Sequence, residues 1–396
     1  MTTDNLLILG NGFDLQCGLK SSYNDFFDST NMRDKQKLIT LFMESFDEIF
    51  NINNTDFESS NIINIKFHNA NFDLFKNRIS SLNEDETFNF WNLIFRKPIK
   101  ENNNWNNIEK IIEDIVCDSD NTPIELNEIE LYYIKLMEET TREPNGYYKE
   151  FKLSGNQKHN FIFALYLCIK TPNIMDMHLY LLKELKRFEH SFFWYLEEEV
   201  ARNETYVSKV KHLLDNIYKS NSNIKQTNVI NFNYTTIANF PKVAIESNVH
   251  GSLLKGNIIF GIDLSNLEDK QGSLFFSKTY RKMHAFENVN IEEFERKRVL
   301  DREIKSITFY GHSLNKSDYS YFQSIFDFYD IYNSEVFLVF YYSIYDKRRS
   351  TEIIEEYTNS VINLLNTYGK TMANGFHGKN FIHKLLLENR IILKEI

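Results

Sequence analysis

The fold is indicated by one stretch near the start of the chain, Leu6-Leu7-Ile8-Leu9-Gly10-Asn11-Gly12-Phe13-Asp14-Leu15. Four apolar residues followed at once by Gly-Asn-Gly are typical of a buried strand that turns directly into a helix. Glycine lets a phosphate approach the backbone, and the first N–H groups of a helix favour an anion. We therefore expect this turn to bind a nucleotide through Gly10, Asn11, Gly12 and Phe13.

The residue after this turn, Asp14, has two interpretations. It is either the N-cap of the helix or a group that acts on the ligand. The spacing departs from the dinucleotide fingerprint G-x-G-x-x-G, because Leu15 occupies the position of the third glycine. The turn therefore predicts a nucleotide-type site without specifying hydride transfer.

Further short apolar runs have the β-branched and aromatic content of strands. Most are continuous rather than alternating, which is typical of parallel strands covered by helices on both faces. The expected strands are Asn5–Gly10, Asn228–Phe232, Val243–Val249, Asn257–Ile262, Ser306–Gly311 and Glu335–Tyr342. We predict an α/β fold with a Rossmann-like parallel sheet, whose ligand lies at the carboxyl ends of the strands.

The long segment between the first two expected strands has helical periodicity. One apolar stripe at three- and four-residue spacing consists of Leu179, Leu182, Leu185, Phe188, Phe192, Tyr195 and Leu196. We therefore expect a large helical insertion after the first strand. The predicted organisation is a Rossmann-like domain of residues 1–31 and 221–396, with a mainly helical module inserted at residues 32–220.

Composition and charge narrow the class of protein. The 396 residues include 42% hydrophobic residues, enough for a large core, and the net charge is −10. This charge and the lack of a basic stripe argue against duplex nucleic acid as a partner. Three widely spaced cysteines argue against a zinc ribbon or a disulfide framework. No run approaches the ~20 apolar residues of a membrane span, so we expect a cytoplasmic protein without membrane contact.

Two later strands are expected to end in polar side chains. Asn231 and Asn233 alternate at the end of one strand, and a buried amide without a partner costs about 1–3 kcal/mol. They meet either the backbone of a turn or ribose hydroxyls and a water. The next strand ends in Val249-His250-Gly251, and an imidazole that titrates near neutrality suits a general base. His250 is therefore the candidate base.

A fourth motif follows the strand at 306–311. Its residues suit an anion or ribose cradle, and the candidates are Gly311, His312, Ser313 and Asn315. The alternative is a plain helix start capped by Ser317 or Asp318. Asp263, after another expected strand, could face the same crevice. Because the histidines lack metal-ligand spacing, no metal is expected.

Taken in order, these motifs resemble the AbiH abortive-infection family of bacterial phage-defence proteins. The resemblance covers most of the chain, with little of it at 32–102 or after Tyr345. The matching motifs are Leu9-Gly10-Asn11-Gly12-Phe13-Asp14-Leu15 with Gly18-Leu19, Tyr23-Asn24-Asp25-Phe26, the Trp105 to Glu109 helix, Phe188-Glu189, Asn231-Phe232-Asn233-Tyr234-Thr235, Val249-His250-Gly251, Phe260-Gly261-Ile262-Asp263 and Tyr310-Gly311-His312-Ser313-Leu314-Asn315.

More distantly, the same order is similar to the sirtuin-like NAD-binding fold. That resemblance implies that Asn233 and His250 serve NAD cleavage and that Ser313 lies on the adenosine side. The sequence departs from the pattern at Thr235, which stands where an acid usually follows the asparagine by two places. The four-cysteine zinc module of the deacylases is also absent, so the resemblance points to NAD hydrolysis rather than protein deacylation.

The resulting hypothesis is an anti-phage protein that cleaves NAD at the nicotinamide–ribose bond, with water as acceptor. Asn233 would orient the ribose and water, and His250 would be the general base. The loop from Gly10 would hold the pyrophosphate, with Asp14 facing the developing positive charge. Depletion of NAD would then stop the infected cell from producing phage.

Two rival functions remain open. One is a nucleotide-binding sensor without turnover, and the other is a metal-dependent nuclease-type toxin with carboxylates such as Asp14, Asp263 and Asp318 around the ion. The expected partners are NAD or a related nucleotide and an unidentified phage trigger, and a second copy of the chain is a candidate. We expect Gly12, Asn233, His250 and Ser313 to surround one crevice.

Overall fold

The fold is described from a computed structural model of the chain. It describes residues 3–29, 32–49, 63–67, 69–79, 88–101, 106–116, 132–133, 136, 149–153, 157–170, 177–220, 224–263, 273–284, 298–315 and 318–396. The chain forms two compact units. The first comprises Met1–Ser22, Phe193–Ile259 and Lys282–Ile396, and the second comprises Tyr23–Phe192 and Phe260–Arg281.

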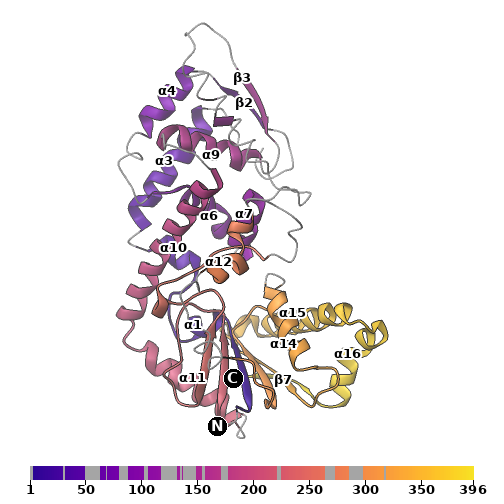
Figure 1. The fold of residues 1–396 in the computed structure, drawn as a ribbon. Helices are drawn as coiled ribbons and strands as arrows, with labels where there is room; N and C mark the ends of the chain where they lie inside the picture. Colours follow the sequence, from indigo (N-terminus) through magenta and orange to yellow (C-terminus); the bar gives the residue numbers. More distant parts are fainter. Residues whose placement is uncertain are drawn as a thin grey trace. The chain divides into compact units, whose positions relative to one another are not determined.

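The first unit is built on a six-stranded sheet in which every neighbouring pair is parallel (Figure 1). The strand order is β5-β4-β1-β6-β7-β8. The strands are β1 Asn5–Leu9, β4 Thr227–Asn231, β5 Val243–Asn248, β6 Ser306–Tyr310, β7 Phe337–Tyr342 and β8 Ile391–Glu395. The prediction of an α/β fold with a parallel sheet is therefore confirmed.

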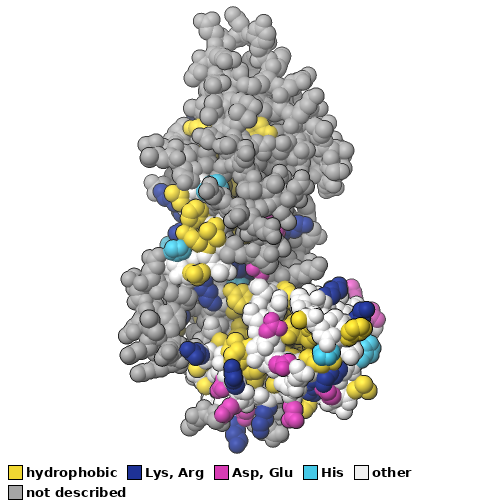
Figure 2. All heavy atoms as spheres, turned by 45° about the vertical axis from the view of Figure 1, so that its right-hand side comes forward, with side chains coloured by type: hydrophobic (Ala, Val, Ile, Leu, Met, Phe, Trp, Pro, Cys, Tyr) yellow, Lys and Arg dark blue, Asp and Glu magenta, His cyan; other side chains and the backbone are white. Residues whose placement is uncertain are grey.

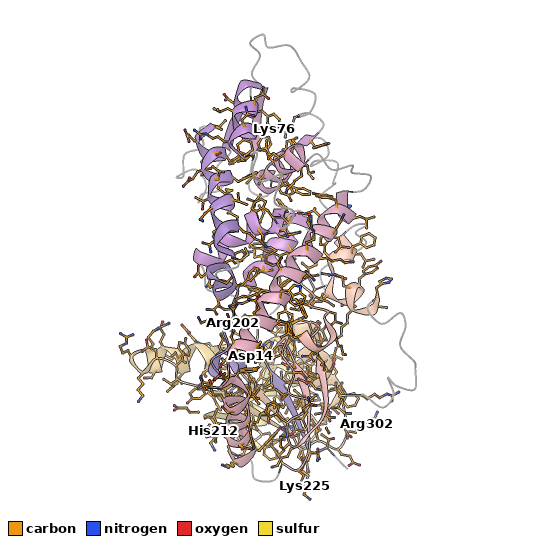
Figure 3. The ribbon with its side chains drawn as sticks, turned by 90° about the vertical axis from the view of Figure 1, so that its left-hand side faces the viewer. Asp14, Lys76, Arg202, His212, Lys225 and Arg302 are labelled. Atoms are coloured by element: carbon orange, nitrogen blue, oxygen red, sulfur yellow. The ribbon has the colours of Figure 1, made fainter. Side chains whose placement is uncertain are left out.

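The strand order contains a reversal of direction. The chain moves outward from β1 through β4 to β5 and then returns to the other side of β1 with β6. In open α/β sheets, the carboxyl ends of the strands at such a switch point are where ligands bind. Figure 3 labels Asp14, which follows β1, toward one end of the sheet, and Lys225, which precedes β4, toward the other.

Helices cover both faces of this sheet. On one face, α14 (Tyr319–Phe328), α15 (Ser350–Thr371) and α16 (Gly375–Leu387) pack on alternate strand residues such as Leu6 and Ile8. On the other, α1 (Gly12–Gln16) and α11 (Tyr206–Ser220) pack on Leu7 and Leu9. Because both side-chain sets of β1 are buried, its sequence is a continuous apolar run. On the surface that carries α15 and α16, acidic and basic side chains are interspersed (Figure 2).

One expected strand is absent from the sheet, and one strand of the sheet was not expected. Asn257–Ile262 is not a strand of the sheet, and only Ile262 makes an isolated bridge, to Ser277. Its apolar residues are buried without strand pairing, so burial alone explains that run. The edge strand β8 is not among the expected strands, because an edge strand has one open side and its sequence, Ile-Ile-Leu-Lys-Glu, is short and ends in charges.

The second unit consists mainly of helices in its described residues. They are α2 (Tyr23–Asp28), α3 (Arg33–Ile49), α4 (Asn69–Arg78), α6 (Phe90–Glu101), α7 (Asn106–Val116), α9 (Gln157–Lys170) and most of α10 (Met177–Arg202), with α12 (Lys278–His284) shared with the first unit. Two antiparallel strands, β2 (Ile63–Phe67) and β3 (Lys149–Leu153), pair beside them. No described helix is long and apolar enough to cross a membrane.

The unit boundaries fall at other residues than those expected. They lie after Ser22 and Phe192, and Phe260–Arg281 joins the second unit. The expected boundary assigns α11 to the inserted module, whereas its apolar stripe packs on the sheet. Helical periodicity shows that a helix buries one face, but it does not show against which partner.

Candidate functional site

Two loops at the switch point pack backbone against backbone. The N–H of Gly10 donates to the carbonyl of Tyr310 (3.0 Å), and the N–H of Gly12 donates to the carbonyl of Gly311 (2.8 Å). The N–H of Phe13 donates to the carbonyl of Gly10 (2.9 Å). Three N–H groups in the turn that was expected to bind a phosphate therefore donate to carbonyl groups of the protein.

The glycines of these loops are required by this close packing. A Cβ on Gly12 would lie 2.8 Å from the Cα of Gly311, and a Cβ on Gly10 would overlap the backbone of His312. Gly311 has a φ of +68°, whereas neither Gly10 nor Gly12 has a positive φ. Gly10 and Gly12 are therefore required by close packing rather than by a left-handed backbone, and a side chain at Gly12 would meet the Gly311 backbone.

Asp14 lies inside the protein rather than at the helix terminus. The N-cap of α1 is Asn11, so the N-cap interpretation of Asp14 is wrong. The Asp14 carboxylate is 1% exposed and accepts hydrogen bonds from the hydroxyl groups of Tyr206 (2.7 Å) and Thr235 (2.9 Å). Burial raises the pKa of Asp14 to about 6, although both hydroxyl groups act in the opposite direction. Its contacts join α1 to α11 and to the turn after β4.

The turn after β4 is organised by the side chain of Asn231. Its Nδ2 donates to the carbonyl of Thr235 (3.0 Å) and to Oε1 of Glu246 (2.7 Å), and its Oδ1 accepts from the N–H of Asn233 (2.9 Å). Glu246 also accepts from the N–H of Ile237. The side chain of Asn231 therefore meets the backbone of its own turn, which is the first of the two interpretations, rather than ribose hydroxyls and a water.

Asn233 differs from Asn231 in one respect. Its Nδ2 donates to the carbonyl of Gly10 (3.1 Å), and its own carbonyl accepts from Nδ2 of Asn248 (3.0 Å). The side chain is 2% exposed, and among the described residues its Oδ1 has no hydrogen-bond partner. A buried acceptor of this kind costs about 1–3 kcal/mol unless a ligand or a water supplies a donor.

Two histidines share one carboxylate at the ends of β5 and β6. The Nε2 of His250 lies 3.3 Å from Oδ1 of Asp318, and the Nε2 of His312 lies 3.5 Å from Oδ2. All three residues are buried. The ring of Phe232 packs against both imidazoles, with ring centroids 5.5 Å from His250 and 4.4 Å from His312.

The hydrogen positions of this trio follow from its contacts. The Nδ1 of His312 accepts from the N–H of Leu314 (2.9 Å), so the hydrogen of the neutral ring is on Nε2, toward Asp318. An ionised Asp318 only accepts, so His250 also directs an Nε2 hydrogen toward it. The nitrogen of His250 that can take up a proton is therefore Nδ1.

Gly251 holds the turn after His250. Its φ is +84°, and a Cβ there would overlap the carbonyl of Asn257. The side chain of Asn257 accepts from the N–H of Ser252 (3.0 Å), and the N–H of Ile259 returns to the carbonyl of His250 (3.0 Å). The glycine is therefore needed for this turn.

The remaining candidate residues, Phe13, Asn11, Ser313 and Asn315, differ in their burial and in their contacts. Phe13 is in the core, edge-on to the ring of Tyr310 at 6.0 Å. The Oδ1 of Asn11 accepts from the hydroxyl of Ser21 (2.6 Å). Ser313 is exposed and accepts from Nδ2 of Asn315 (2.8 Å). The candidates lie at the carboxyl ends of β1, β4, β5 and β6, while a crevice around them stays a prediction.

The sequence interpretation misses the groups that hold this site together. It treats Asp318 only as a helix cap or a metal ligand, and Ser317, the other proposed cap, lies outside the described residues. Asp318 occupies the N-cap position of α14 without making a side-chain cap bond. Tyr206 and Thr235 are distant in sequence from Asp14, so no local pattern links them. The only signal in the sequence was an acid, Asp14, placed between two apolar residues.

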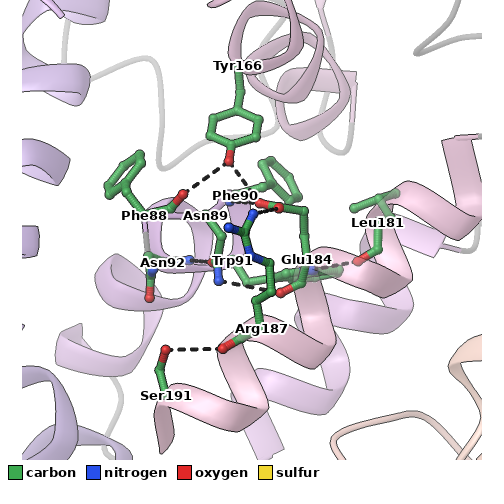
Figure 4. Close-up of polar contacts among 10 residues, drawn as sticks. All are labelled: Phe88, Asn89, Phe90, Trp91, Asn92, Tyr166, Leu181, Glu184, Arg187 and Ser191. Atoms are coloured by element: carbon green, nitrogen blue, oxygen red, sulfur yellow. Dashed lines mark hydrogen bonds and ion pairs between the residues drawn. The ribbon is translucent and has the colours of Figure 1, made fainter. Parts of the chain in front are cut away.

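Glu184 is a buried carboxylate away from these strand ends, and its contacts lie within the protein. In the second unit, Glu184 accepts from the hydroxyl of Tyr166 (2.8 Å), the N–H of Phe90 (3.2 Å) and the guanidinium of Arg187 (3.0 Å) (Figure 4). Nowhere in the described residues do three His, Cys, Asp or Glu side chains form a group that could hold a metal. Asp263, which the nuclease hypothesis proposes as a metal ligand, belongs to the second unit.

Comparison with known proteins gives one match. The family described as "Bacteriophage abortive infection AbiH" matches residues 6–342. No curated protein and no solved structure matches the chain. The matched region runs from β1 to β7 and contains all the candidate site residues. Because it covers most of the chain, the protein belongs to the bacteriophage abortive infection AbiH family.

Proposed function

We propose that this abortive-infection protein cleaves NAD to nicotinamide and ADP-ribose at the carboxyl ends of β4, β5 and β6. The observation that carries the proposal is the pairing of His250 with Asp318 beside the loop that contains Asn233. The buried Oδ1 of Asn233 has no hydrogen-bond partner among the described residues. A base and an orienting amide at neighbouring strand ends are what hydrolysis of a ribosyl bond requires.

The sheet topology supports a dinucleotide as the ligand. Counted along the chain, the sheet strands lie in the order third, second, first, fourth, fifth, sixth, which is the order of doubly wound dinucleotide-binding sheets. This likeness concerns the fold and is an analogy for the ligand. The polar side chains at the strand ends are the features of this chain that support a ligand there, beyond the likeness of fold.

The reaction can be written with each group in a role. The bond between the ribose C1′ and the nicotinamide nitrogen breaks, and its electron pair neutralises the pyridinium. A water oxygen bonds to C1′, and its proton passes to Nδ1 of His250. Asp318 stabilises the resulting imidazolium through Nε2, and Oδ1 of Asn233 accepts from a ribose hydroxyl or from the water.

The test compares His250→Ala with His212→Ala, a matched control on the exposed face of α11. Purified protein is mixed with NAD, with and without lysate of phage-infected cells, and nicotinamide and ADP-ribose are quantified. We expect the His250 variant to lose about 10²–10⁴-fold in rate, because that is the typical contribution of a positioned base. The His212 variant should equal the wild type.

Two outcomes would contradict the proposal. A His250→Ala protein that melts normally and consumes NAD at the wild-type rate removes His250 from the mechanism. A wild-type protein that binds ADP-ribose but never consumes NAD, even with infected-cell lysate, is a nucleotide sensor instead. Loss of phage protection in the His250 variant would then report on binding rather than on turnover.

A further inference from the structure

The glycine loop has three backbone donors that are not available to the phosphates of a bound nucleotide, and it carries no Lys or Arg. The N–H groups of Gly10, Gly12 and Phe13 are bonded to protein carbonyls, and α1 has only five residues. A helix this short offers little dipole to an anion. Positive charge beside the phosphates would therefore come from basic residues elsewhere at the strand ends.

Lys282 places a cation at the carboxyl end of β5. Its Nζ lies 3.5 Å from the carbonyl of Asn248, the last residue of β5 and two residues before His250. It also lies 6.0 Å from the ring centroid of Tyr321, which packs against Phe232 at 5.8 Å. Phe232 in turn packs against His250, so Lys282 belongs to the same group of side chains.

The charge of Lys282 is not neutralised by a described carboxylate. No acid among the described residues lies within ion-pair distance of Lys282 or Lys255. The nearest acid along β5, Glu246, accepts from Asn231 and Ile237, and Asp318 faces the two histidines. Partial burial is the larger of two causes that lower the pKa of Lys282, and the nearby positive charge of Lys255 is the smaller.

Two cations that repel each other without an acid between them favour a bound anion. Lys255 ends the short 3-10 helix Leu253–Lys255, which directly follows the His250-Gly251 turn. An anion beside Lys282 would relieve both the desolvation and the repulsion. Phosphate oxygens are the anionic groups of the proposed substrate.

We propose that Lys282, together with Lys255, binds the phosphate groups of a nucleoside diphosphate at the carboxyl end of β5, beside His250. This inference rests on the proposed function for the identity of the substrate. It places the diphosphate near β5 rather than on the Gly10–Asp14 loop. It also gives the site a specificity determinant for nucleotides over nucleosides.

The test measures binding rather than turnover. ADP, adenosine and inorganic pyrophosphate are titrated by calorimetry into wild type, Lys282→Gln, the Lys282→Gln/Lys255→Gln double variant and Lys379→Gln. The last is a charge-matched control on the exposed face of α16. We expect the affinity for ADP to fall about tenfold or more in Lys282→Gln and further in the double variant, because hydrogen bonds to charged groups contribute this much. Pyrophosphate should compete with ADP in the wild type.

The outcomes separate this inference from the proposed hydrolysis. Unchanged ADP affinity in both lysine variants, or no ADP binding by the wild type, overturns the phosphate site. NAD cleavage with an unchanged KM in Lys282→Gln overturns it as well and leaves the hydrolysis standing. Lysine-dependent ADP binding without NAD cleavage supports the phosphate site and removes the hydrolysis.

Discussion

Replacement of Asp14 by Asn tests what this carboxylate contributes to the folded protein. The amide keeps the size of the side chain, and its Oδ1 can still accept from the hydroxyl of Tyr206. The new Nδ2 can donate to the hydroxyl of Thr235, which lies 2.9 Å from Oδ2 in the wild type. The substitution therefore removes the buried charge while preserving the hydrogen bonds.

The magnitude follows from the pKa. Burial raises the pKa of Asp14 from 3.8 to about 6, so the folded protein holds this proton more tightly than the unfolded chain. Stability from this group is present below pH ~4 and is lost as the pH rises through about 6, a loss of about 3 kcal/mol at neutral pH. The Asp14→Asn variant avoids that loss, because its amide carries no charge at any pH.

The assay is thermal melting of wild type, Asp14→Asn and Asp215→Asn between pH 4 and pH 8. Asp215 is exposed on α11, so its variant controls for the change in net charge. We expect Asp14→Asn to melt higher than the wild type at pH 7.5, by up to roughly 6–12 °C for a unit of this size, and to match it near pH 4. An Asp14→Asn protein that melts lower at both pH values would refute the reasoning, because the ionised carboxylate would then be a net stabiliser.

Three further outcomes are expected in the same melting assay and in a thiol-labelling assay. Gly311→Ala should be destabilised by several kcal/mol and Gly256→Ala by about 1 kcal/mol, because both have positive φ but only the first lacks space for a Cβ; equal melting temperatures would contradict this. Tyr166→Phe should cost about 1–3 kcal/mol, since it removes a donor to the buried Glu184; an unchanged melting temperature would count against it. Burial raises the pKa of the Cys17 thiol to about 12, so it should resist iodoacetamide at pH 8 until the protein unfolds, and rapid labelling of native protein would disprove this.

The motifs in the sequence locate the polar strand ends but misjudge several reasons for them. The continuous apolar runs predict the parallel sheet, since strands covered on both faces cannot alternate. The polar residues after those runs lie at the carboxyl ends of four strands, as parallel pairing requires. The sequence interpretation assigns the glycines at 10 and 12 to ligand approach, whereas in the structure backbone atoms of the protein occupy those spaces.

The burial of the strand-end side chains decides which variant tests the mechanism. Asn233 and His250 are both buried, and Asn233 donates to the carbonyl of Gly10. Asn233→Ala therefore mixes a structural loss with a functional one, and the His250 comparison is the cleaner test.

By itself, the sequence determined the class of fold and the order of the polar strand ends. These depend on local periodicity and on the direction of parallel strands, which are properties of contiguous residues. Only the tertiary structure decided that Asp318 joins His250 to His312, that Asp14 is held by Tyr206 and Thr235, and that Lys282 lies at the end of β5. The physical reason is that these groups are brought together by helix packing and loop closure, for which no spacing along the chain provides a signal.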